Sequence, residues 1–230
     1  MKGYIQRLRY RLAGLHKLRN FMLHILIADD HAIIRKGLIQ IILSQYPSAQ
    51  IGEAGDVESL VAELFKKDWD LVISDISMPG RSGVEALQQI KKSKPQIPVL
   101  MMSMHPEDQY ALRVLKAGAS GYLSKNSIHE ELIKAIQAVL LGKKYITSSV
   151  AEKLAGALNN DTDKPPHEHL SNREFEVLKL IAAGKSVSDI ADQLFLSATT
   201  VSTYRARILD KMGFKTNADL TRYTLEKGLI

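Results

Sequence analysis

The sequence predicts an α/β domain built on a five-stranded, doubly wound parallel sheet, followed by a small all-α domain. Between residues 23 and 141, short apolar runs alternate five times with amphipathic segments. That alternation is typical of strand–helix units in a parallel sheet. A polar run that contains two prolines, residues 159–166, then interrupts the chain. From Leu170 onward the apolar residues follow helical spacing alone, which predicts the second domain.

The predicted strands are short apolar runs, and each is followed by an apolar stripe with helical spacing. The strands are expected at residues 23–28, 50–54, 71–74, 99–102 and 120–123. The inward faces of the five helices are expected to include Ile34, Leu38 and Ile42, then Leu60 and Leu64, then Leu87 and Ile90, then Val114 and Leu115, and finally Leu132 and Ile136. Gly142 is expected to stop the fifth helix.

Residues 143–169 are predicted to form a linker with a short helix. Ser149 and Glu152 have the spacing of a capping box, and apolar residues follow at helical spacing. The polar, proline-containing run marks a domain boundary. The predicted divisions are a basic extension at 1–21, the α/β domain at 22–142, the linker at 143–169 and the helical domain at 170–230.

The helical domain is predicted to contain four helices. Ser171 and Glu174 form a second capping box, and Gly184 stops the helix that follows them. After the next helix, a short turn leads to Ser197, which is expected to cap a helix that ends near Met212. The last helix is expected at about residues 217–227.

Composition excludes several classes of protein. The chain has 230 residues and no cysteine, so disulfide scaffolds, thiol nucleophiles and cysteine-based metal sites are excluded. No apolar run approaches the roughly 20 residues of a membrane span. We therefore expect a cytoplasmic protein that does not enter a membrane.

The net charge of +6 is located in one segment. Residues 1–21 carry six basic residues and no acidic residue, so the rest of the chain is neutral overall. The apolar residues of this segment follow helical spacing, which is compatible with an interfacial or nucleic-acid-binding arm. The alternative is a leader from an upstream start, with Met22 as the working start, and we expect the segment to be non-essential.

Reactive side chains are expected at one edge of the predicted sheet. Asp75 ends the third strand and is followed by loop-forming Pro79, Gly80 and Gly83. The other strands end on polar residues as well. These are Asp29, Asp30, Ser103 and Lys125. Because the carboxyl ends of parallel strands meet at one edge, we expect these side chains to converge.

The converging residue types suggest phosphoryl transfer. Clustered carboxylates repel one another unless a cation joins them, and carboxylate and carbonyl oxygens suit Mg²⁺. A nearby lysine and hydroxyl would hold phosphate oxygens while Asp75 attacks. Taken singly, each residue has an ordinary alternative. A strand-end aspartate often caps a helix, Ser103 fits a turn, and lysine usually faces solvent.

On these residues, positions 23–141 resemble the receiver domain of two-component response regulators, which has a flavodoxin-like fold. The resemblance implies that Asp75 is the phosphoacceptor. It implies that Asp30, Asp75 and the backbone carbonyl of Ser77 bind Mg²⁺ or Mn²⁺, with Asp29 acting through water. Further roles implied by the resemblance are those of Ser103 as the switch hydroxyl, Lys125 as the partner of the phosphoryl group and Tyr122 as the aromatic switch residue. Many members have proline after this lysine, whereas Asn126 follows here.

The phosphoryl donor is expected to be a separate molecule. The sequence has no glycine-rich nucleotide loop of the G-x-x-x-x-G-K type. The resemblance implies a sensor histidine kinase, or a small acyl phosphate, as the donor.

The helix predicted at residues 198–212 has the features of a DNA-reading helix. A tight turn precedes it and Ser197 caps it, which fits helix-turn-helix geometry. Hydroxyls near its start suit phosphates, and its arginines and small polar groups suit base edges. The residues expected on its exposed side are Thr199, Thr200, Ser202, Thr203, Arg205, Ala206 and Arg207. A solvated helix face or a generic helical hairpin explains the periodicity nearly as well.

Residues 170–228 resemble a LuxR-type DNA-binding domain, on the Leu-Ser-x-Arg-Glu start, Ile190-Ala191, Thr200-Val201 and Asn217-Ala218. The resemblance places base-contacting positions at Ser202, Thr203 and Ala206. We expect backbone contacts from Arg205, Arg207 and Lys211, and a further phosphate contact from Lys215 and Asn217. Candidates for a dimer interface on the last helix are Thr221, Tyr223 and Thr224.

Together the two resemblances indicate the NarL/FixJ subfamily of response regulators. The expected function is regulation of transcription at promoter DNA, without enzyme activity, by a protein that forms a homodimer when Asp75 is phosphorylated. One alternative is a small Mg²⁺-dependent phosphatase of the dehalogenase type, but such enzymes want an acid where Ser77 stands. Another is a DNA-binding protein whose acidic site has only a structural role.

Overall fold

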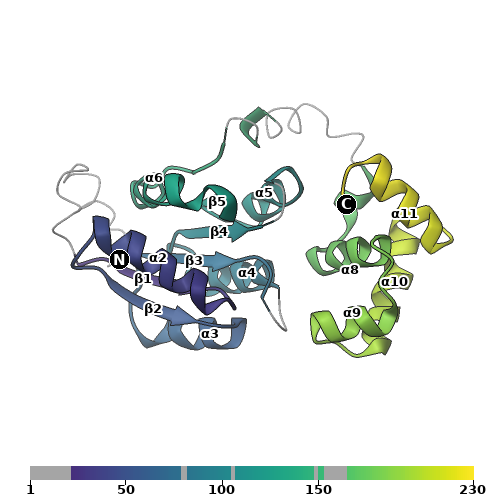
Figure 1. The fold of residues 1–230 in the computed structure, drawn as a ribbon, viewed down its shortest axis with the longest axis horizontal. Helices are drawn as coiled ribbons and strands as arrows, with labels where there is room; N and C mark the ends of the chain where they lie inside the picture. Colours follow the sequence, from purple (N-terminus) through teal and green to yellow (C-terminus); the bar gives the residue numbers. More distant parts are fainter. Residues whose placement is uncertain (1–21, 79–81, 105–106, 148–149, 153–164) are drawn as a thin grey trace. The chain divides into compact units, whose positions relative to one another are not determined.

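The computed structural model describes residues 22–78, 82–104, 107–147, 150–152 and 165–230 (Figure 1). They form two compact units, which divide between residues 153 and 154. The predicted extension at 1–21, most of the short linker helix with Ser149, and the loop residues Pro79 and Gly80 lie outside the described residues. Within the described ranges, none of the helices combines the length and the hydropathy that crossing a bilayer requires.

The first unit contains the predicted five-stranded parallel sheet, with strand order β2-β1-β3-β4-β5. The strands are β1 (His24–Ala28), β2 (Gln50–Ala54), β3 (Leu71–Asp75), β4 (Val99–Ser103) and β5 (Gly121–Ser124). From β1 the chain first adds a strand on one side, and then β3, β4 and β5 on the other. In sheets of this kind, ligands bind outside the carboxyl ends of the strands at this switch point.

Helices cover both faces of this sheet (Figure 1). One face carries α2 (Ala32–Gln45) and α6 (Ile128–Leu140), and the other carries α3 (Val57–Lys66), α4 (Gly83–Ser93) and α5 (Glu107–Lys116). The predicted inward stripes explain the packing of the first pair, since Leu38 and Ile42 of α2 and Leu132 and Ile136 of α6 are buried. The sequence pattern therefore predicted the doubly wound arrangement correctly.

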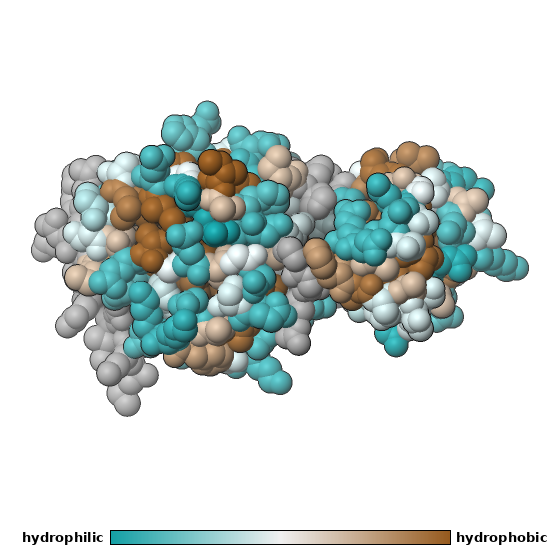
Figure 2. Space-filling model, turned by 60° about the horizontal axis from the view of Figure 1, so that its bottom comes forward, coloured by the Kyte–Doolittle hydropathy of each residue, from teal (hydrophilic) through white to brown (hydrophobic). Residues whose placement is uncertain are grey.

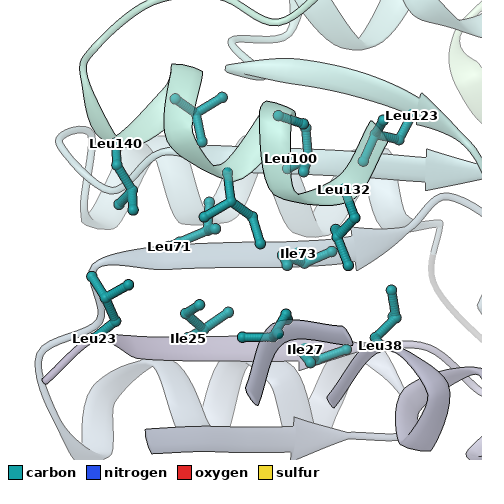
Figure 3. Close-up of a cluster of buried hydrophobic side chains, with 14 of the residues drawn as sticks. Leu23, Ile25, Ile27, Leu38, Leu71, Ile73, Leu100, Leu123, Leu132 and Leu140 are labelled. Carbon is teal, nitrogen blue, oxygen red and sulfur yellow. The ribbon is translucent and has the colours of Figure 1, made fainter. Parts of the chain in front are cut away.

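The core between the sheet and the α2–α6 pair is assembled from alternate residues of the strands. Figure 3 shows leucine and isoleucine side chains from neighbouring strands stacked beneath the helices. Ile27 of β1, Ile73 of β3 and Leu123 of β5 all belong to this cluster and are at most 1% exposed. Because side chains alternate across a strand, the residue two positions after each of these continues on the same face.

The segment after α6 covers part of the edge of the sheet at β5. Tyr145 forms an isolated parallel bridge with Gly121. Its N–H donates to the carbonyl of Ser120 at 3.0 Å, and its carbonyl accepts from the N–H of Tyr122 at 3.2 Å. The chain leaving the receiver-like unit is thus attached to β5. Sequence reasoning treated all of 143–169 as linker and did not predict this pairing.

The second unit is helical, as predicted. A short 3₁₀ helix, η3 (Pro166–His169), precedes α8 (Asn172–Ala182), α9 (Val187–Leu194), α10 (Ala198–Met212) and α11 (Asn217–Glu226). Figure 2 shows one face of the molecule, on which hydrophilic side chains border small hydrophobic areas in both units. Among the described residues, exposed large apolar side chains include Phe195 and Leu225 in this unit.

Capping fixes the ends of these helices. The predicted capping box of Ser171 and Glu174 is present at the start of α8. Equivalent boxes, which the sequence analysis did not predict, start α9 at Ser186 and α11 at Thr216. Gly213 takes the left-handed conformation just after α10, which ends at Met212 as predicted. Phe195 also takes this conformation, with φ at 54°, between α9 and α10.

Candidate functional sites

Three charged side chains continue one face of the sheet beyond the core. Asp29, Asp75 and Lys125 each stand two residues after a core residue, at the carboxyl ends of β1, β3 and β5 respectively. The parallel register places Ala28 beside Ser74, so the ends of β1 and β3 are adjacent. This shared phase explains why residues far apart in the sequence meet, as the strand-end argument predicted.

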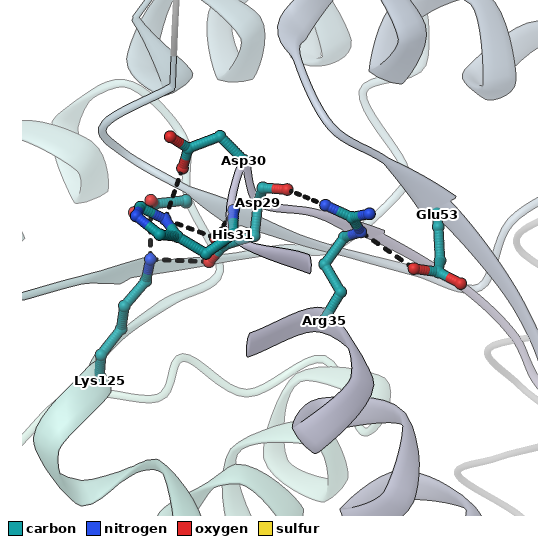
Figure 4. Close-up of polar contacts among 7 residues, drawn as sticks. Asp29, Asp30, His31, Arg35, Glu53 and Lys125 are labelled. Atoms are coloured by element: carbon teal, nitrogen blue, oxygen red, sulfur yellow. Dashed lines mark hydrogen bonds and ion pairs between the residues drawn. The ribbon is translucent and has the colours of Figure 1, made fainter. Parts of the chain in front are cut away.

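Lys125 joins the two buried carboxylates. Its Nζ lies 2.7 Å from Oδ2 of Asp29 and 2.7 Å from Oδ2 of Asp75. Figure 4 shows the lysine reaching up to the acidic residues from the start of the last strand–helix connection. All three side chains are at most 5% exposed. One ammonium balances only one of these two buried carboxylates, and Asp30 adds a third negative charge. The ionised cluster therefore needs further positive charge to become neutral.

Burial dominates the ionisation of Asp75. Loss of hydration raises the pKa of Asp75 to about 6, although attraction and a hydrogen bond from Lys125 lower it. The charge of Asp29 raises this pKa further, while the backbone amide of Ser77 lowers it. For Lys125, burial lowers the pKa, but the two carboxylates outweigh burial and hold the pKa above its ordinary value. The pocket therefore keeps a carboxylate that is easily protonated beside a firmly charged lysine.

His31 belongs to the same cluster, and the sequence analysis missed it. Its Nδ1 lies 2.8 Å from Oδ1 of Asp30 and 3.3 Å from Oδ1 of Asp29. One donor atom from each of Asp29, Asp30, His31 and Asp75 lies within 4.8 Å of every other, which is close enough for one metal ion. Its position directly after the two acids was the available signal. The acidic pocket is consistent with a divalent metal site.

A loop follows β3, and the start of α4 at Gly83 lies close to Asp75. The N–H of Gly83 donates to the carbonyl of Ile76 at 2.8 Å. A Cβ atom at position 83 would overlap the carbonyl oxygen of Asp75, so only glycine fits this approach. Ser77, predicted to offer its carbonyl to a metal, is exposed at the start of this loop. Glycine at position 83 therefore allows the backbone to approach Asp75 closely.

Ser103 and Tyr122 lie on the strands next to the pocket. Ser103 ends β4 and is 1% exposed, and its register partner is Ser124, the residue before Lys125. Tyr122 is 1% exposed, so it is a fully buried residue of β5. Both residues interact with other groups of the chain. The structure therefore brings Ser103 to the edge where Asp75 lies, and leaves the switch roles as predictions.

The predicted DNA-reading helix is α10. Val201, Ile208 and Met212 are buried. The hydroxyl of Ser197 accepts from the N–H of Thr200 at 3.0 Å, which confirms the predicted cap. The residues left exposed on the other side include Thr199, Ser202, Thr203, Ala206 and Arg207. The intermediate exposure of Thr200 and Arg205 places them at the margin of this side.

Several of these side chains already contact their own domain. The Oγ1 of Thr203 donates to the carbonyl of Thr199 at 2.9 Å. Arg205 donates from Nε to Oδ1 of Asn217 at 2.6 Å, which joins α10 to the start of α11. Lys215 is exposed beside this contact. Phosphate or base contacts by these residues stay predictions.

Lys211 and two residues of α11 contact groups of their own unit, which was not predicted. Lys211 is paired with the buried carboxylate of Glu174 at 2.7 Å, so its ammonium has an intramolecular partner. Tyr223 and Thr224, expected at a dimer interface, are buried against their own unit. The hydroxyl of Tyr223 lies 2.7 Å from Nδ1 of His167. Both residues are therefore part of the domain core, because the face of α11 that bears them packs on this unit.

Both units match known protein families. Residues 25–137 match the response regulator receiver domain, and residues 168–224 match the bacterial regulatory proteins of the luxR family. The chain is 34% identical to the response regulator UvrY of Escherichia coli strain K12 over 209 residues, which are 90% of this chain and 96% of UvrY. The chain is a response regulator of the NarL/FixJ family.

Other relatives of this response regulator match over nearly its whole length. The oxygen regulatory protein NreC of Staphylococcus epidermidis is 36% identical over 214 residues, with 90% of this chain and 98% of NreC covered. A structure of RcsB from Salmonella enterica serovar Typhimurium, bound to promoter rprA with the phosphomimetic BeF3⁻, has a TM-score of 0.60 and 28% identity. The match covers 88% of this chain and 98% of RcsB. In a further structure, two RcsB dimers are bound to two parallel DNAs.

These matches set aside one of the two alternatives that the sequence left open. The response regulator is a DNA-binding protein of a two-component system with a receiver domain and a helix-turn-helix domain. It is a transcription regulator and not an enzyme, so the alternative of a dehalogenase-type phosphatase is set aside.

Proposed function

We propose that phosphorylation of Asp75 switches this response regulator between two states that differ in dimerisation and in affinity for promoter DNA. The observation that carries the proposal is the position of Lys125, 2.7 Å from both Asp29 and Asp75 at one sheet edge. This pocket belongs to a chain that also has a capped, exposed reading helix. A reactive carboxylate and a DNA-binding surface in one molecule are the parts that such a switch requires.

The pocket fits Mg²⁺ or Mn²⁺. Three carboxylates face one ammonium, so a divalent cation would bring the ionised cluster to neutrality. Asp30 and Asp75 would hold the ion with the backbone carbonyl of Ser77, and Asp29 would hold it through water. When bound, the ion supplies positive charge to the phosphoryl oxygens and to the carboxylates.

The reaction at Asp75 is a nucleophilic substitution at phosphorus. A carboxylate oxygen of Asp75 forms a bond to phosphorus, while the bond from phosphorus to an imidazole nitrogen or an acyl oxygen of the donor breaks. The electron pair of that bond leaves with the donor, and Asp75 becomes an acyl phosphate. Lys125 is already positioned to pair with a phosphoryl oxygen, and its raised pKa keeps it charged.

The switch then depends on Ser103 and Tyr122. The hydroxyl of Ser103 would move to a phosphoryl oxygen, and the vacated space would change the surroundings of Tyr122. Both side chains are buried, so a movement of either one changes the packing around it. A sensor histidine kinase or a small acyl phosphate is the proposed donor, and the regulator would work in the cytoplasm, where promoter DNA is read.

The output is proposed to be a homodimer that places two copies of α10 one DNA turn apart. Ser202, Thr203 and Ala206 would meet base edges, and the remaining predicted contacts would meet phosphates. The exposed side of α10 and the DNA-bound RcsB relatives support this proposal. The proposal divides the chain into an extension at 1–21, a receiver domain at 22–142, a linker at 143–169 and a DNA-binding domain at 170–230. The extension at 1–21 is proposed to be non-essential.

Labelling by a radioactive acyl phosphate in the presence of Mg²⁺ tests the assignment of Asp75. The full chain is expected to take up label, and Asp75→Asn is expected to take up none, because the amide is not a nucleophile. Asp68→Asn, which changes an exposed aspartate of the same unit, is the matched control and should label like the unchanged chain. Undiminished labelling of Asp75→Asn would refute the assignment.

A further inference from the structure

Arg35 holds the backbone that carries Asp29 and Asp30, the two predicted metal-binding acids that follow β1. Its Nη1 donates to the carbonyl oxygen of Asp29 at 2.7 Å. That carbonyl belongs to the peptide group between Asp29 and Asp30, so the contact fixes the plane that sets how the two carboxylates stand relative to each other. Figure 4 shows the guanidinium on the opposite side of the acidic residues from Lys125.

Glu53 orients the guanidinium for this contact. The Nε of Arg35 donates to Oε2 of Glu53 at 2.9 Å, and the arginine side chain is only 18% exposed. Arg35 lies in the first turns of α2, and Glu53 lies on β2 beside Ile27 of β1. A planar guanidinium with donors in fixed directions can satisfy both partners at once, which an ammonium group does less well.

The Asp29 backbone is held from its other side as well. Its N–H donates to the carbonyl of Ala54 at 3.2 Å. Its side-chain Oδ1 accepts from the N–H of His31 at 2.8 Å. With the carbonyl held by Arg35, the peptide groups on both sides of Asp29 and its carboxylate are fixed. A metal site needs its ligands in place before binding, and groups that orient ligands affect affinity strongly.

We infer that Arg35, oriented by Glu53, is a positioning residue for the metal site formed by Asp29 and Asp30. This inference rests on the proposed function, because it concerns the same pocket. It predicts the opposite of what charge alone predicts. Arg35 is a cation near a cation site, so its removal would tighten metal binding if only its charge mattered. If it positions the acids, its removal weakens metal binding.

The test is the dissociation constant of Mn²⁺ for the full chain, measured by the paramagnetic resonance signal of free Mn²⁺, with Mg²⁺ as competitor. Arg35→Met should bind Mn²⁺ about tenfold more weakly than the unchanged chain. Lys36→Met removes the same charge from the next, exposed residue of α2 and is the matched control. It should bind as tightly as the unchanged chain or slightly more tightly. Arg35→Lys should recover only part of the affinity.

Thermal unfolding of the metal-free variants separates positioning from a general loss of structure. The inference requires weakened binding by Arg35→Met at a temperature where it is fully folded. Equal or tighter binding by Arg35→Met overturns the inference, as does full recovery in Arg35→Lys. If the unchanged chain binds Mn²⁺ and is labelled by acyl phosphate, the proposed function stands even when this inference falls. If the unchanged chain does neither, the proposed function itself fails.

Discussion

Asp75 combines almost complete burial with an ionisable side chain, and this combination has a cost in stability. Its pKa is raised to about 6 from an ordinary value of 3.8, with burial as the largest cause. A group whose pKa is higher in the folded state binds protons more tightly there. The stabilisation that proton binding gives is therefore fully present below pH 3.8 and is lost as the pH rises through about 6.

This linkage predicts a pH-dependent difference between the unchanged chain and Asp75→Asn in metal-free buffer. Between pH 4 and pH 7, the unchanged chain should lose about 1–3 kcal/mol of unfolding free energy relative to the variant, because only the unchanged chain must ionise a buried carboxylate. Urea unfolding with a chelator present measures this. Parallel pH profiles for the two proteins would contradict the ionisation assigned to Asp75.

Phe195 is a second residue with an energetic cost, because its backbone conformation is unfavourable. Its φ of 54° lies in the left-handed region, and 68% of the side chain is exposed, so few contacts offset the backbone strain. Phe195→Asn should raise the unfolding free energy by about 1 kcal/mol, because asparagine tolerates this conformation better. Phe65→Asn changes another exposed phenylalanine, in helical conformation, and should give no gain. A gain in both variants would show that hydropathy, not backbone strain, is responsible.

Among the individual residues, the sequence correctly predicted the positions of those site residues that follow from strand alternation. Asp75 and Lys125 continue the core face of their strands, so their meeting could be argued without coordinates. The contact between Arg35 and Glu53 could not, because it depends on how α2 lies across β1 and β2. Tyr223 and Thr224, which were candidates for a dimer interface, are buried in their own unit. Helical spacing alone does not tell which face of α11 packs on its own unit.

At the scale of elements, the edge of the sheet at β5 is covered by the segment that leads out of the receiver. An exposed strand edge presents unpaired backbone groups, and Tyr145 satisfies two of them beside Tyr122. Gly121 permits this approach, since a Cβ there would lie 2.8 Å from the carbonyl oxygen of Tyr145 and 2.9 Å from Cδ1 of Leu100. The beginning of the linker is therefore packed against the strand that leads to Lys125.

A matched pair of glycine substitutions tests this packing. Gly121→Ala should lower the unfolding free energy of the receiver by about 1–3 kcal/mol, because its new methyl group overlaps backbone and core atoms. Gly37→Ala in α2 should raise it by about 0.5–1 kcal/mol through helix propensity, because among the described residues no atom beyond the adjacent residues and the helix's own backbone lies within 4 Å of the new Cβ. Denaturant unfolding measures both. Equal effects of the two substitutions would mean that Gly121 has no close packing to preserve.

The elements themselves were largely predictable, and the exceptions have physical causes. All five strands and the helices between them were expected. Three strands, β3, β4 and β5, end one residue later than predicted, because Asp75, Ser103 and Ser124 still pair with the neighbouring strand. The strands β1 and β5 also begin one residue later than predicted. The cap of α8 was predicted from Ser171 and Glu174. The bridge at Tyr145 was missed because a single paired residue leaves no periodic pattern in the sequence.

At the scale of the whole molecule, the regulator consists of two compact units, one with the phosphorylation pocket and one with the predicted reading helix. The proposed phosphorylation of Asp75 would add negative charge to a pocket that already contains three carboxylates and one lysine. The central claim is that this local change alters how the regulator associates and binds DNA.

The most direct test measures the oligomeric state and the promoter-DNA affinity of the full chain before and after treatment with acyl phosphate and Mg²⁺. Light scattering and a DNA-binding titration on the same samples give both quantities. Treatment should convert monomer to dimer and tighten DNA binding, and Asp75→Asn should respond in neither respect. If the unchanged chain takes up phosphate at Asp75 but keeps its oligomeric state and its DNA affinity, Asp75 is not the switch.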